Sequence, residues 1–246
     1  MSSTDTPLVT IVAAVLNEAE NIRPVCIEIA TSLAGLEPYE VVFVDDGSTD
    51  ATVAELIAAR DVLPQLRVVS HDRRCGKSAA LRTGIEAAHG IWIATIDGDG
   101  QDDPREIVSM LALALETGPV KPGPLVVGVR LKRNDNLSRR FATRFANGLR
   151  RRLLNDGCPD TGAPMKLFRR DDFLQLPQFE GVHRFLPALF QHYGSALICK
   201  PVHHRARLHG SSKYTNLNRA MVGVRDMMGV MWLQSRTQVP QRVTES

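Results

Sequence analysis

The chain has few cysteines, and none is placed to cross-link a fold. Cys26, Cys75, Cys158 and Cys199 lie far apart among 246 residues, without a CxxC pair or a His/Cys cluster at zinc-ligand spacing. Isolated thiols of this kind are typical of proteins from reducing compartments. The sequence therefore predicts reduced thiols, a core built without disulfides, and a cytoplasmic location.

Long apolar runs are also missing. The N-terminal residues carry no basic region followed by an apolar stretch, and no segment reaches the roughly 18 apolar residues of a membrane span. Internal repeats and low-complexity tracts are absent as well. A chain of this length with 43% hydrophobic residues fits one large α/β domain, or one domain with a tail.

Aromatic residues make up only 5% of the chain, with three tyrosines. Because nucleic-acid binders of the stacking type need aromatic rings among their basic residues, no nucleic-acid partner is predicted. Charge is abundant but uneven: residues 1–120 hold 8 Lys and Arg against 19 Asp and Glu, and residues 121–246 hold 22 against 8. The basic half favours anionic lipid or phosphorylated substrates, although neutralisation of one half by the other explains the same asymmetry.

Strands and helices are predicted to alternate through the first half. The strands lie at 9–16, 40–44, 66–69 and 91–96, and each precedes a helix, at 19–33, 51–60, 78–88 and 104–116. This rhythm builds a mostly parallel, Rossmann-like α/β sheet flanked by helices. Beyond a Pro/Gly-rich loop at 119–124, strands are predicted at 125–129, 165–168 and 196–202, and helices at 137–154, 184–193 and 214–233.

Acidic residues follow two of these strands where each strand ends. Asp45-Asp46-Gly47-Ser48-Thr49-Asp50 follows the second strand, and Asp97-Gly98-Asp99-Gly100-Gln101 follows the fourth. Ligands of open α/β sheets bind beyond the carboxyl ends of the strands, so Asp46 is predicted to be spare for a ligand. Asp97 and Asp99, with Gln101 as a third contributor, would bind Mg²⁺ or Mn²⁺ and leave positions for the phosphates of a nucleotide-diphosphate donor.

Helix-terminal chemistry explains part of this pattern more simply. Asp103 and Pro104 fit the N-cap and first position of the next helix, which leaves Asp97 and Asp99 unexplained. Lys77, after Gly76 at a predicted helix start, would contact an anion or nucleotide, or be an ordinary solvated lysine. The pairs His183-Arg184 and His203-His204 lack metal-ligand spacing, so we expect structural or lipid-phosphate contacts from them.

Three spaced motifs resemble family 2 glycosyltransferases: Asn17-Glu18 after the first strand, Asp45–Asp50, and Asp97–Pro104. The resemblance implies an A-type nucleotide-sugar fold. It places Asn17, Glu18 and Asp46 on the donor, and Asp97, Asp99 and Gln101 around the metal and diphosphate.

The basic half resembles the polyprenyl-phosphate branch of that family, the type of dolichyl-phosphate mannose synthase and undecaprenyl-phosphate glycosyltransferases. The matching segments are Gly128-Val129-Arg130, Arg144, Asp160-Thr161-Gly162 before Lys166–Arg170, and Arg207–Tyr214. The resemblance implies that Arg130 and Arg144 hold the lipid phosphate. It also implies that the segment with Arg207, Ser212 and Lys213 closes over the site, with Ser212 on the donor side.

We therefore predict an inverting, metal-dependent transfer of a sugar from a nucleotide diphosphate to a polyprenyl phosphate. The predicted catalytic residues are Asp99, Arg130, Arg144, Asp160, Arg207 and Lys213. Asp160 would touch the acceptor or simply form an Asx-turn. A transferase to a glycan or glycolipid hydroxyl is the alternative and would need a carboxylate base, Asp160 or Asp102. A non-catalytic nucleotide-sugar binding protein is a further alternative.

The last predicted helix is amphipathic. Its apolar positions Leu217, Met221, Val224, Met228 and Met231 recur at spacings of four and three and end beside Trp232, a pattern shared by interfacial helices, core helices and dimer seams. Arginines at 139, 140, 144 and 150–152 would add attraction to anionic lipid. We expect a catalytic domain at 1–210, with a donor half at 1–120 and an acceptor half at 121–210. Residues 211–246 would form an interfacial helix and tail, attached peripherally to the cytoplasmic membrane face, with a homo-oligomer or a separate membrane protein as a further partner.

Overall fold

The computed structural model describes residues 6–36, 38–130, 150, 152–154, 156–206 and 216–240, with the side chains of the last helix described from Val222 onward. Its strands are β1 (Val9–Val15), β2 (Tyr39–Asp45), β3 (Leu66–Ser70), β4 (Trp92–Asp97), β5 (Leu125–Arg130), β6 (Lys166–Arg169) and β7 (Leu197–Val202). Its helices are α1 (Ala19–Leu33), α2 (Thr52–Ala58), α3 (Lys77–Ala87), α4 (Arg105–Glu116), α6 (Arg170–Leu174), α7 (Leu186–His192) and α8 (Asn216–Arg236), with 3₁₀ turns at Ala59–Asp61 and Val182–Arg184.

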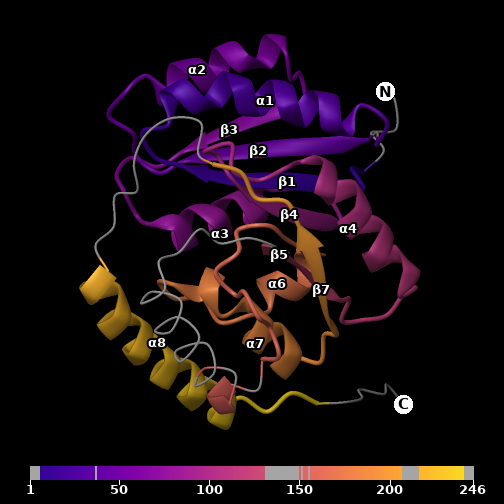
Figure 1. Ribbon diagram of the computed structural model, residues 1–246, viewed down its shortest axis with the longest axis vertical. Helices are drawn as coiled ribbons and strands as arrows, with labels where there is room; N and C mark the ends of the chain where they lie inside the picture. The colour runs from indigo at the N-terminus through magenta and orange to yellow at the C-terminus, as the bar shows by residue number, and fades with distance from the viewer. Residues whose placement is uncertain are drawn as a thin grey trace.

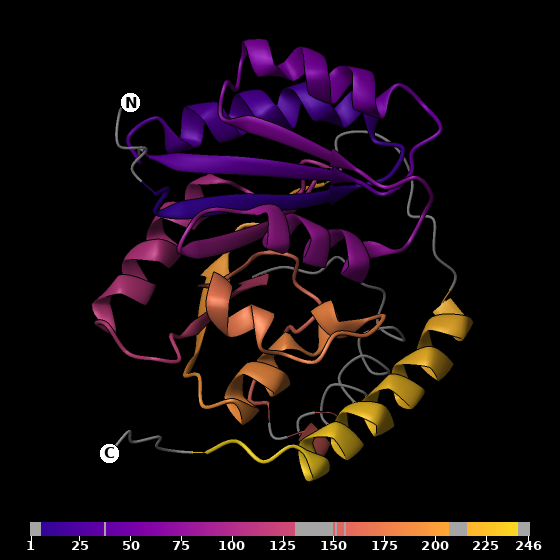
Figure 2. The same ribbon diagram turned by 180° about the vertical axis from the view of Figure 1, so that it is seen from behind.

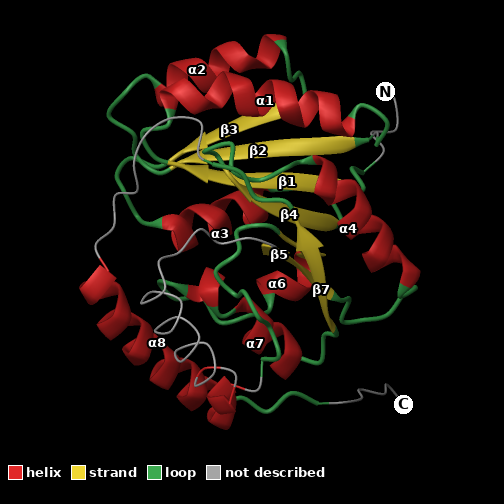
Figure 3. Cartoon of the chain, in the orientation of Figure 1, coloured by secondary structure: helices red, strands yellow, loops and turns green. Residues whose placement is uncertain are grey.

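The strands form one sheet in the order β3-β2-β1-β4-β6-β5-β7 (Figure 3). Neighbours β3, β2, β1 and β4 run parallel, and so do β5 and β7. Strand β6 is antiparallel to both of its neighbours, β4 and β5. The predicted mostly parallel α/β sheet is confirmed, and strands from both halves of the chain contribute to it.

Helices cover both faces of the sheet (Figures 1 and 2). Side chains alternate between the faces of a strand, so Ile11 of β1 joins the core cluster under α1 and α4, while Val12 packs with Leu81 and Ile85 of α3. Helix α3 lies so close to the sheet that a Cβ added at Gly84 would be 2.5 Å from the Val12 side chain. The close approach fixes the start of α3 near the carboxyl ends of the strands.

Two predicted helices differ from those observed. The helix predicted at 51–60 tightens after Ala58 into the 3₁₀ turn Ala59–Asp61, where the N–H groups of Val62 and Leu63 share the Ala59 carbonyl oxygen. The helix predicted at 184–193 is α7, which begins two residues later and is preceded by the 3₁₀ turn Val182–Arg184. Pro187 lies in the first turn of α7, where its missing N–H costs no hydrogen bond.

Helix α8 lies along the outside of the fold (Figures 1 and 2). It is attached through buried Val230 and through Asp226, whose carboxylate accepts a 2.7 Å hydrogen bond from Arg184. The predicted C-terminal helix is confirmed, and on its outer side Val224, Met228 and Trp232 are 52%, 58% and 63% exposed. Among the described residues, no helix combines the length and the hydropathy needed to span a bilayer. The helix predicted at 137–154 lies mostly outside the described residues.

Candidate active site

Asp46, at the carboxyl end of β2, holds the loop that leads into α3. Its buried carboxylate accepts hydrogen bonds from the backbone N–H groups of Cys75 and Gly76, at 2.8 Å each, and lies 2.9 Å from His71 Nδ1. Gly47 allows this loop to approach: a Cβ there would lie 2.6 Å from the Arg73 carbonyl carbon, and its φ is +76°. The prediction that Asp46 is spare was wrong, because both of its oxygens position the loop. Its contact with a donor stays a prediction.

Asp46 also belongs to a mixed group of candidate metal ligands. Asp46, His71 and Cys75 each offer one ligand atom, and these atoms lie within 4.8 Å of one another. Sequence reasoning missed this group because its members have no characteristic spacing. Oxygen, nitrogen and sulfur together suit zinc-like metals rather than Mg²⁺. Since the Asp46 oxygens already accept backbone hydrogen bonds, we retain Asp97, Asp99 and Gln101 as the predicted Mg²⁺ or Mn²⁺ ligands.

The turn after β1 is tied to the turn after β2. Asn17, at φ +53°, receives Thr49 N–H on its side-chain oxygen at 2.8 Å, and its own N–H donates to Ser48 Oγ at 2.8 Å. The Glu18 N–H donates to Thr52 Oγ1 at 2.9 Å. Asn17 and Glu18 therefore fix the shape of this edge of the sheet, and their predicted donor contacts are not tested by these bonds.

Asp97, Asp99 and Gln101 occupy the turn that leaves β4. Asp99 is buried, and its Oδ1 accepts the Gln101 N–H at 3.1 Å. The Gln101 side-chain Nε2 donates to the Arg205 carbonyl at 3.1 Å, which leaves the oxygen end of the amide as the ligand atom. Carboxylate and amide oxygens from one turn are the donor set that Mg²⁺ and Mn²⁺ prefer, so these residues fit the predicted metal.

Lys77 reaches this turn from the start of α3, and its Nζ pairs with the Asp97 carboxylate. Burial alone would raise the pKa of Asp97, but the Lys77 ammonium holds it below its usual range. The interpretation of Lys77 as an ordinary solvated lysine is therefore wrong. Asp103 was predicted at the N-cap of α4, but Pro104 takes that position and the helix begins at Arg105. The Asp103 carboxylate lies one residue earlier and still accepts the Arg105 N–H at 3.1 Å.

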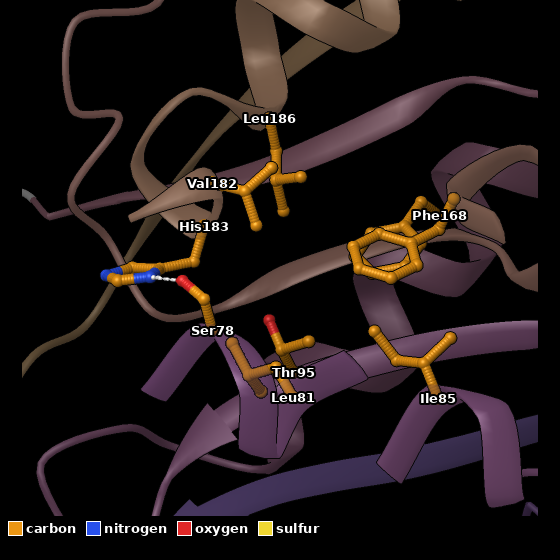
Figure 4. Close-up of a pocket in the computed structure, with 9 residues that line it drawn as sticks. Ser78, Leu81, Ile85, Thr95, Phe168, Val182, His183 and Leu186 are labelled. Atoms are coloured by element: carbon orange, nitrogen blue, oxygen red, sulfur yellow. Dashed lines mark hydrogen bonds between the residues drawn. The ribbon is translucent and has the colours of Figure 1, made fainter. Parts of the chain in front are cut away.

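Two buried titratable groups that the sequence did not place in the site, Lys166 and His183, lie beside the turn. Lys166 of β6 donates to the Ala163 carbonyl, and burial together with the Lys77 charge lowers its pKa to about 8. His183 lies 2.7 Å from the Ser78 hydroxyl at the edge of a small, mostly apolar pocket between α3 and α7 (Figure 4). Burial lowers the pKa of His183 to about 3, so its ring is neutral near pH 7.

Arg130 and Asp160, both predicted to be catalytic, are brought together. Arg130 Nε and Nη2 donate to the two Asp160 oxygens at 2.7 and 2.8 Å, a side-on pair at the end of β5. Burial disfavours the Arg130 charge, but Asp160 outweighs it, with smaller contributions from Asp102 and Asp97, and raises the pKa of Arg130. Strands β4 and β5 are both antiparallel to β6, which lies between them, so the pair and the acidic turn of β4 lie at the same edge of the sheet.

Arg150 was predicted to lie on the surface and attract anionic lipid, but its side chain is largely buried. Its side chain is 12% exposed and donates to Asp156 Oδ2 at 2.8 Å, Thr161 Oγ1 at 2.6 Å and the Cys158 carbonyl at 2.6 Å. Its guanidinium thus holds the loop that carries Asp160 and is not exposed to attract lipid. A cluster of arginines in a sequence does not distinguish a buried loop anchor from a surface charge.

The chain after β7 crosses the acidic turn. The Arg205 N–H donates to the Gln101 carbonyl at 2.9 Å, and Arg205 Nη2 lies 2.6 Å from Glu28. His203 pairs with Glu106 at 3.2 Å. The predicted site residues Arg144, Arg207, Ser212 and Lys213 lie outside the described residues, and so does the arrangement of the segment predicted to close over the site.

Comparison with known proteins identifies relatives of the chain. The family model described as Glycosyl transferase family 2 matches residues 10–176. Dodecaprenyl-phosphate galacturonate synthase of Rhizobium johnstonii is 34% identical over 229 residues, which are 91% of this chain and 66% of the relative. An undecaprenyl-phosphate 4-deoxy-4-formamido-L-arabinose transferase of Yersinia enterocolitica is 32% identical over 212 residues, 84% of this chain and 62% of the relative. This chain thus spans less than two thirds of each of these relatives.

Solved structures share the fold. Glucosyl-3-phosphoglycerate synthase from Mycobacterium tuberculosis in complex with Mg²⁺ and uridine diphosphate superposes with a TM-score of 0.65 at 23% identity, over 96% of this chain and 81% of that one. The same synthase with Mn²⁺, UDP-glucose and glycerol 3-phosphate gives 0.63 at 24% identity, over 96% and 82%. This likeness confirms the expected A-type fold.

Proposed function

We propose, from the premise that the chain belongs to glycosyl transferase family 2, that it transfers a sugar from a nucleotide diphosphate to a polyprenyl phosphate. The observation that carries this proposal is that an acidic group and a basic group lie together at the carboxyl ends of the strands. The acidic turn with Asp97 and Asp99 follows β4, and Arg130, held by Asp160, ends β5 at the same edge. The names of two relatives contain dodecaprenyl phosphate and undecaprenyl phosphate, which supports a polyprenyl phosphate as the acceptor.

The donor would lie over the acidic turn. Asp97, Asp99 and Gln101 would hold Mg²⁺ or Mn²⁺, which when bound supplies positive charge for the departing diphosphate. Asn17, Glu18, Asp46, Lys77 and Ser212 would line the remaining donor site. Asp46 would act by holding the loop before α3, so that Lys77 faces the phosphates.

The acceptor needs positive charge rather than a base, because a phosphate oxygen is already a nucleophile. A planar arginine suits two phosphate oxygens, and Asp160 orients the Arg130 guanidinium for this contact. Arg144, Arg207 and Lys213 would complete the basic group. The phosphate oxygen would then attack the anomeric carbon from the face opposite the diphosphate, which inverts the configuration.

A lipid acceptor requires access to a membrane surface. The exposed side chains Val224, Met228 and Trp232 of α8 would enter the interfacial layer, and the arginines at 139, 140 and 144 would add charge attraction. Peripheral attachment to the cytoplasmic face, with a homo-oligomer or a separate membrane protein as partner, is part of the proposal. Residues 1–210 would act as the catalytic unit.

A transfer assay tests the function. It measures the transfer of label from UDP- and GDP-sugars to a polyprenyl phosphate in detergent, with Mn²⁺ or Mg²⁺. We expect a labelled lipid-phosphate sugar, and we expect Asp99→Ala to reduce its formation at least a hundredfold. Asp61→Ala, at an exposed carboxylate outside the site, is the control and should retain full activity. Labelling of a glycan hydroxyl, with inert polyprenyl phosphate, would overturn the proposal in favour of a hydroxyl acceptor.

A further inference from the structure

Lys77 is placed at the acidic turn by contacts from the neighbouring strand. The Gly76 N–H donates to Asp46 at 2.8 Å, and α3 begins at the next residue. From this fixed backbone position the Lys77 ammonium pairs with Asp97 Oδ1. A cation supplied by the protein thus stands at one of the oxygens predicted to bind the metal.

Lys77 differs from Arg130 and Lys166, two further cations near this turn. Arg130 is held by two hydrogen bonds to Asp160, and Lys166 is buried with its ammonium on the Ala163 carbonyl. The side chains of Lys77 and Asp97 are each 32% exposed. Compared with Arg130, at 17%, and Lys166, which is buried, Lys77 is therefore more accessible to solvent and ligands, and it can exchange partners without breaking a fully buried contact.

We propose that Lys77 is a resident counter-ion that occupies the divalent metal's place on Asp97 until a diphosphate arrives. A metal at Asp97 and an ammonium on the same oxygen repel each other, so each weakens the binding of the other. A diphosphate offers Lys77 new oxygens and releases Asp97 for the metal. Metal and diphosphate therefore favour each other's binding by the same factor, as linkage requires.

This inference rests on the proposed function only in requiring that a metal and a nucleoside diphosphate bind at this turn. Its first consequence is that the metal alone binds weakly to the wild-type protein. Its second is that removal of the Lys77 charge strengthens the binding of the metal alone and weakens the mutual enhancement. An ordinary diphosphate-binding lysine would leave the affinity for the metal alone unchanged.

The test is the affinity for Mn²⁺, measured from the electron paramagnetic resonance signal of free Mn²⁺, with and without UDP or GDP. We expect Lys77→Met to bind Mn²⁺ alone about tenfold more tightly than the wild type, the size expected when a neighbouring like charge is removed. The gain in Mn²⁺ affinity on adding diphosphate should fall by a similar factor. Lys77→Arg should restore wild-type behaviour, and Arg82→Met, at an exposed cation on the same helix, should not alter it.

Equal or weaker binding of Mn²⁺ alone by Lys77→Met than by the wild type would overturn the inference. So would an unchanged enhancement by diphosphate. If Mn²⁺ fails to bind either protein even with diphosphate, the metal dependence of the proposed function falls together with the inference. If the Mn²⁺ results are as expected but lipid phosphate is inert in the transfer assay, only the proposed acceptor falls.

Discussion

The side-on pair of Arg130 and Asp160 separates two chemical roles for Asp160. A carboxylate with both oxygens bonded to a guanidinium is a weak base, because proton uptake would break charge-assisted hydrogen bonds. The same pair keeps a planar donor at the end of β5. Asp160 is therefore better suited to positioning Arg130 than to removing a proton from a sugar hydroxyl.

Asp160→Asn should separate these roles in the transfer assay. If Asp160 orients Arg130, we expect KM for polyprenyl phosphate to rise about tenfold while kcat changes little, since one charge-assisted contact is weakened. A general base would instead show a loss of kcat of about 10²-fold or more with KM unchanged. Asp61→Asn is the matched control, because Asp61 forms a similar pair with Arg23 on the surface, at 2.9 Å.

Glu40 lies near the amino end of β2, away from the site, and stabilises the fold. Burial alone would raise its pKa, but hydrogen bonds from the His89 N–H, Thr10, Arg67 and the His89 ring outweigh burial and lower it. A carboxylate with a lowered pKa stabilises the fold above its ordinary pKa, and this contribution is lost as the pH falls through the folded-state value.

Glu40→Gln should therefore lower the free energy of unfolding by about 2 kcal/mol at pH 7, as expected for weakening a buried, charged hydrogen-bond network. The difference from wild type should begin to shrink as the pH falls below the ordinary glutamate pKa of about 4.3, and it should vanish only below the lower folded-state pKa, where the wild-type carboxyl is neutral in both states. Urea unfolding at pH 7 and at a pH below the folded-state pKa measures the difference. Glu86→Gln, at an exposed pair with Arg82, should change stability little at either pH, and an equal loss at both pH values for Glu40→Gln would contradict the argument.

At the scale of elements, local patterns predicted the strands and the acidic turns that follow them. Those features depend on residues close in sequence: apolar runs form β2 and β4, and aspartates end them. The pairs of the site depend on the sheet order instead. Strand β6 enters between β4 and β5, which puts Lys166 beside Thr95, and no periodicity encodes that insertion. For the same reason the partners of Lys77 and Arg130 were not predicted.

Helix α8 presents an apolar face that its contacts with the fold do not use. Val224 and Met228, four residues apart, share this face with Trp232, while Val230 is buried against the body. The protein has two tryptophans, and the other, Trp92, is buried in β4. A change in the environment of α8 can therefore be read from Trp232.

Addition of vesicles with anionic lipid should shift the tryptophan emission to shorter wavelength, and Trp232→Phe should abolish the shift. Met228→Ser should weaken vesicle binding about tenfold or more, because burial of a methionine contributes about 1.5–3 kcal/mol. Ile57→Ser, at an exposed position of α2, is the control and should bind as the wild type does. If the protein sediments with the vesicles but its tryptophan emission is unchanged, a surface other than α8 binds the lipid.

At the scale of the whole molecule, the two oppositely charged halves are joined by shared structure. Strands β4 and β6 pair from Trp92 with Arg169 to Thr95 with Lys166. Ion pairs also cross between the halves, including Lys200 with Glu106 and Arg205 with Glu28 at 2.6 Å. Part of the charge asymmetry is thus neutralised within the fold, as the simpler interpretation of the sequence held. We propose that residues 1–210 unfold as one unit.

Ligands of the donor half should then stabilise the whole chain. Mn²⁺ with UDP at about 100 times its Kd adds about 2.7 kcal/mol to the native state, which raises Tm. In Trp232→Phe the emission of Trp92 reports the junction of the halves, and far-UV circular dichroism reports all helices and strands. We expect both signals to change in one coincident transition, with and without ligand, because the halves share one sheet. The alternative outcome is two transitions, with the ligand raising the Tm of only one of them. That result would show that the acidic and basic halves are separate folding units.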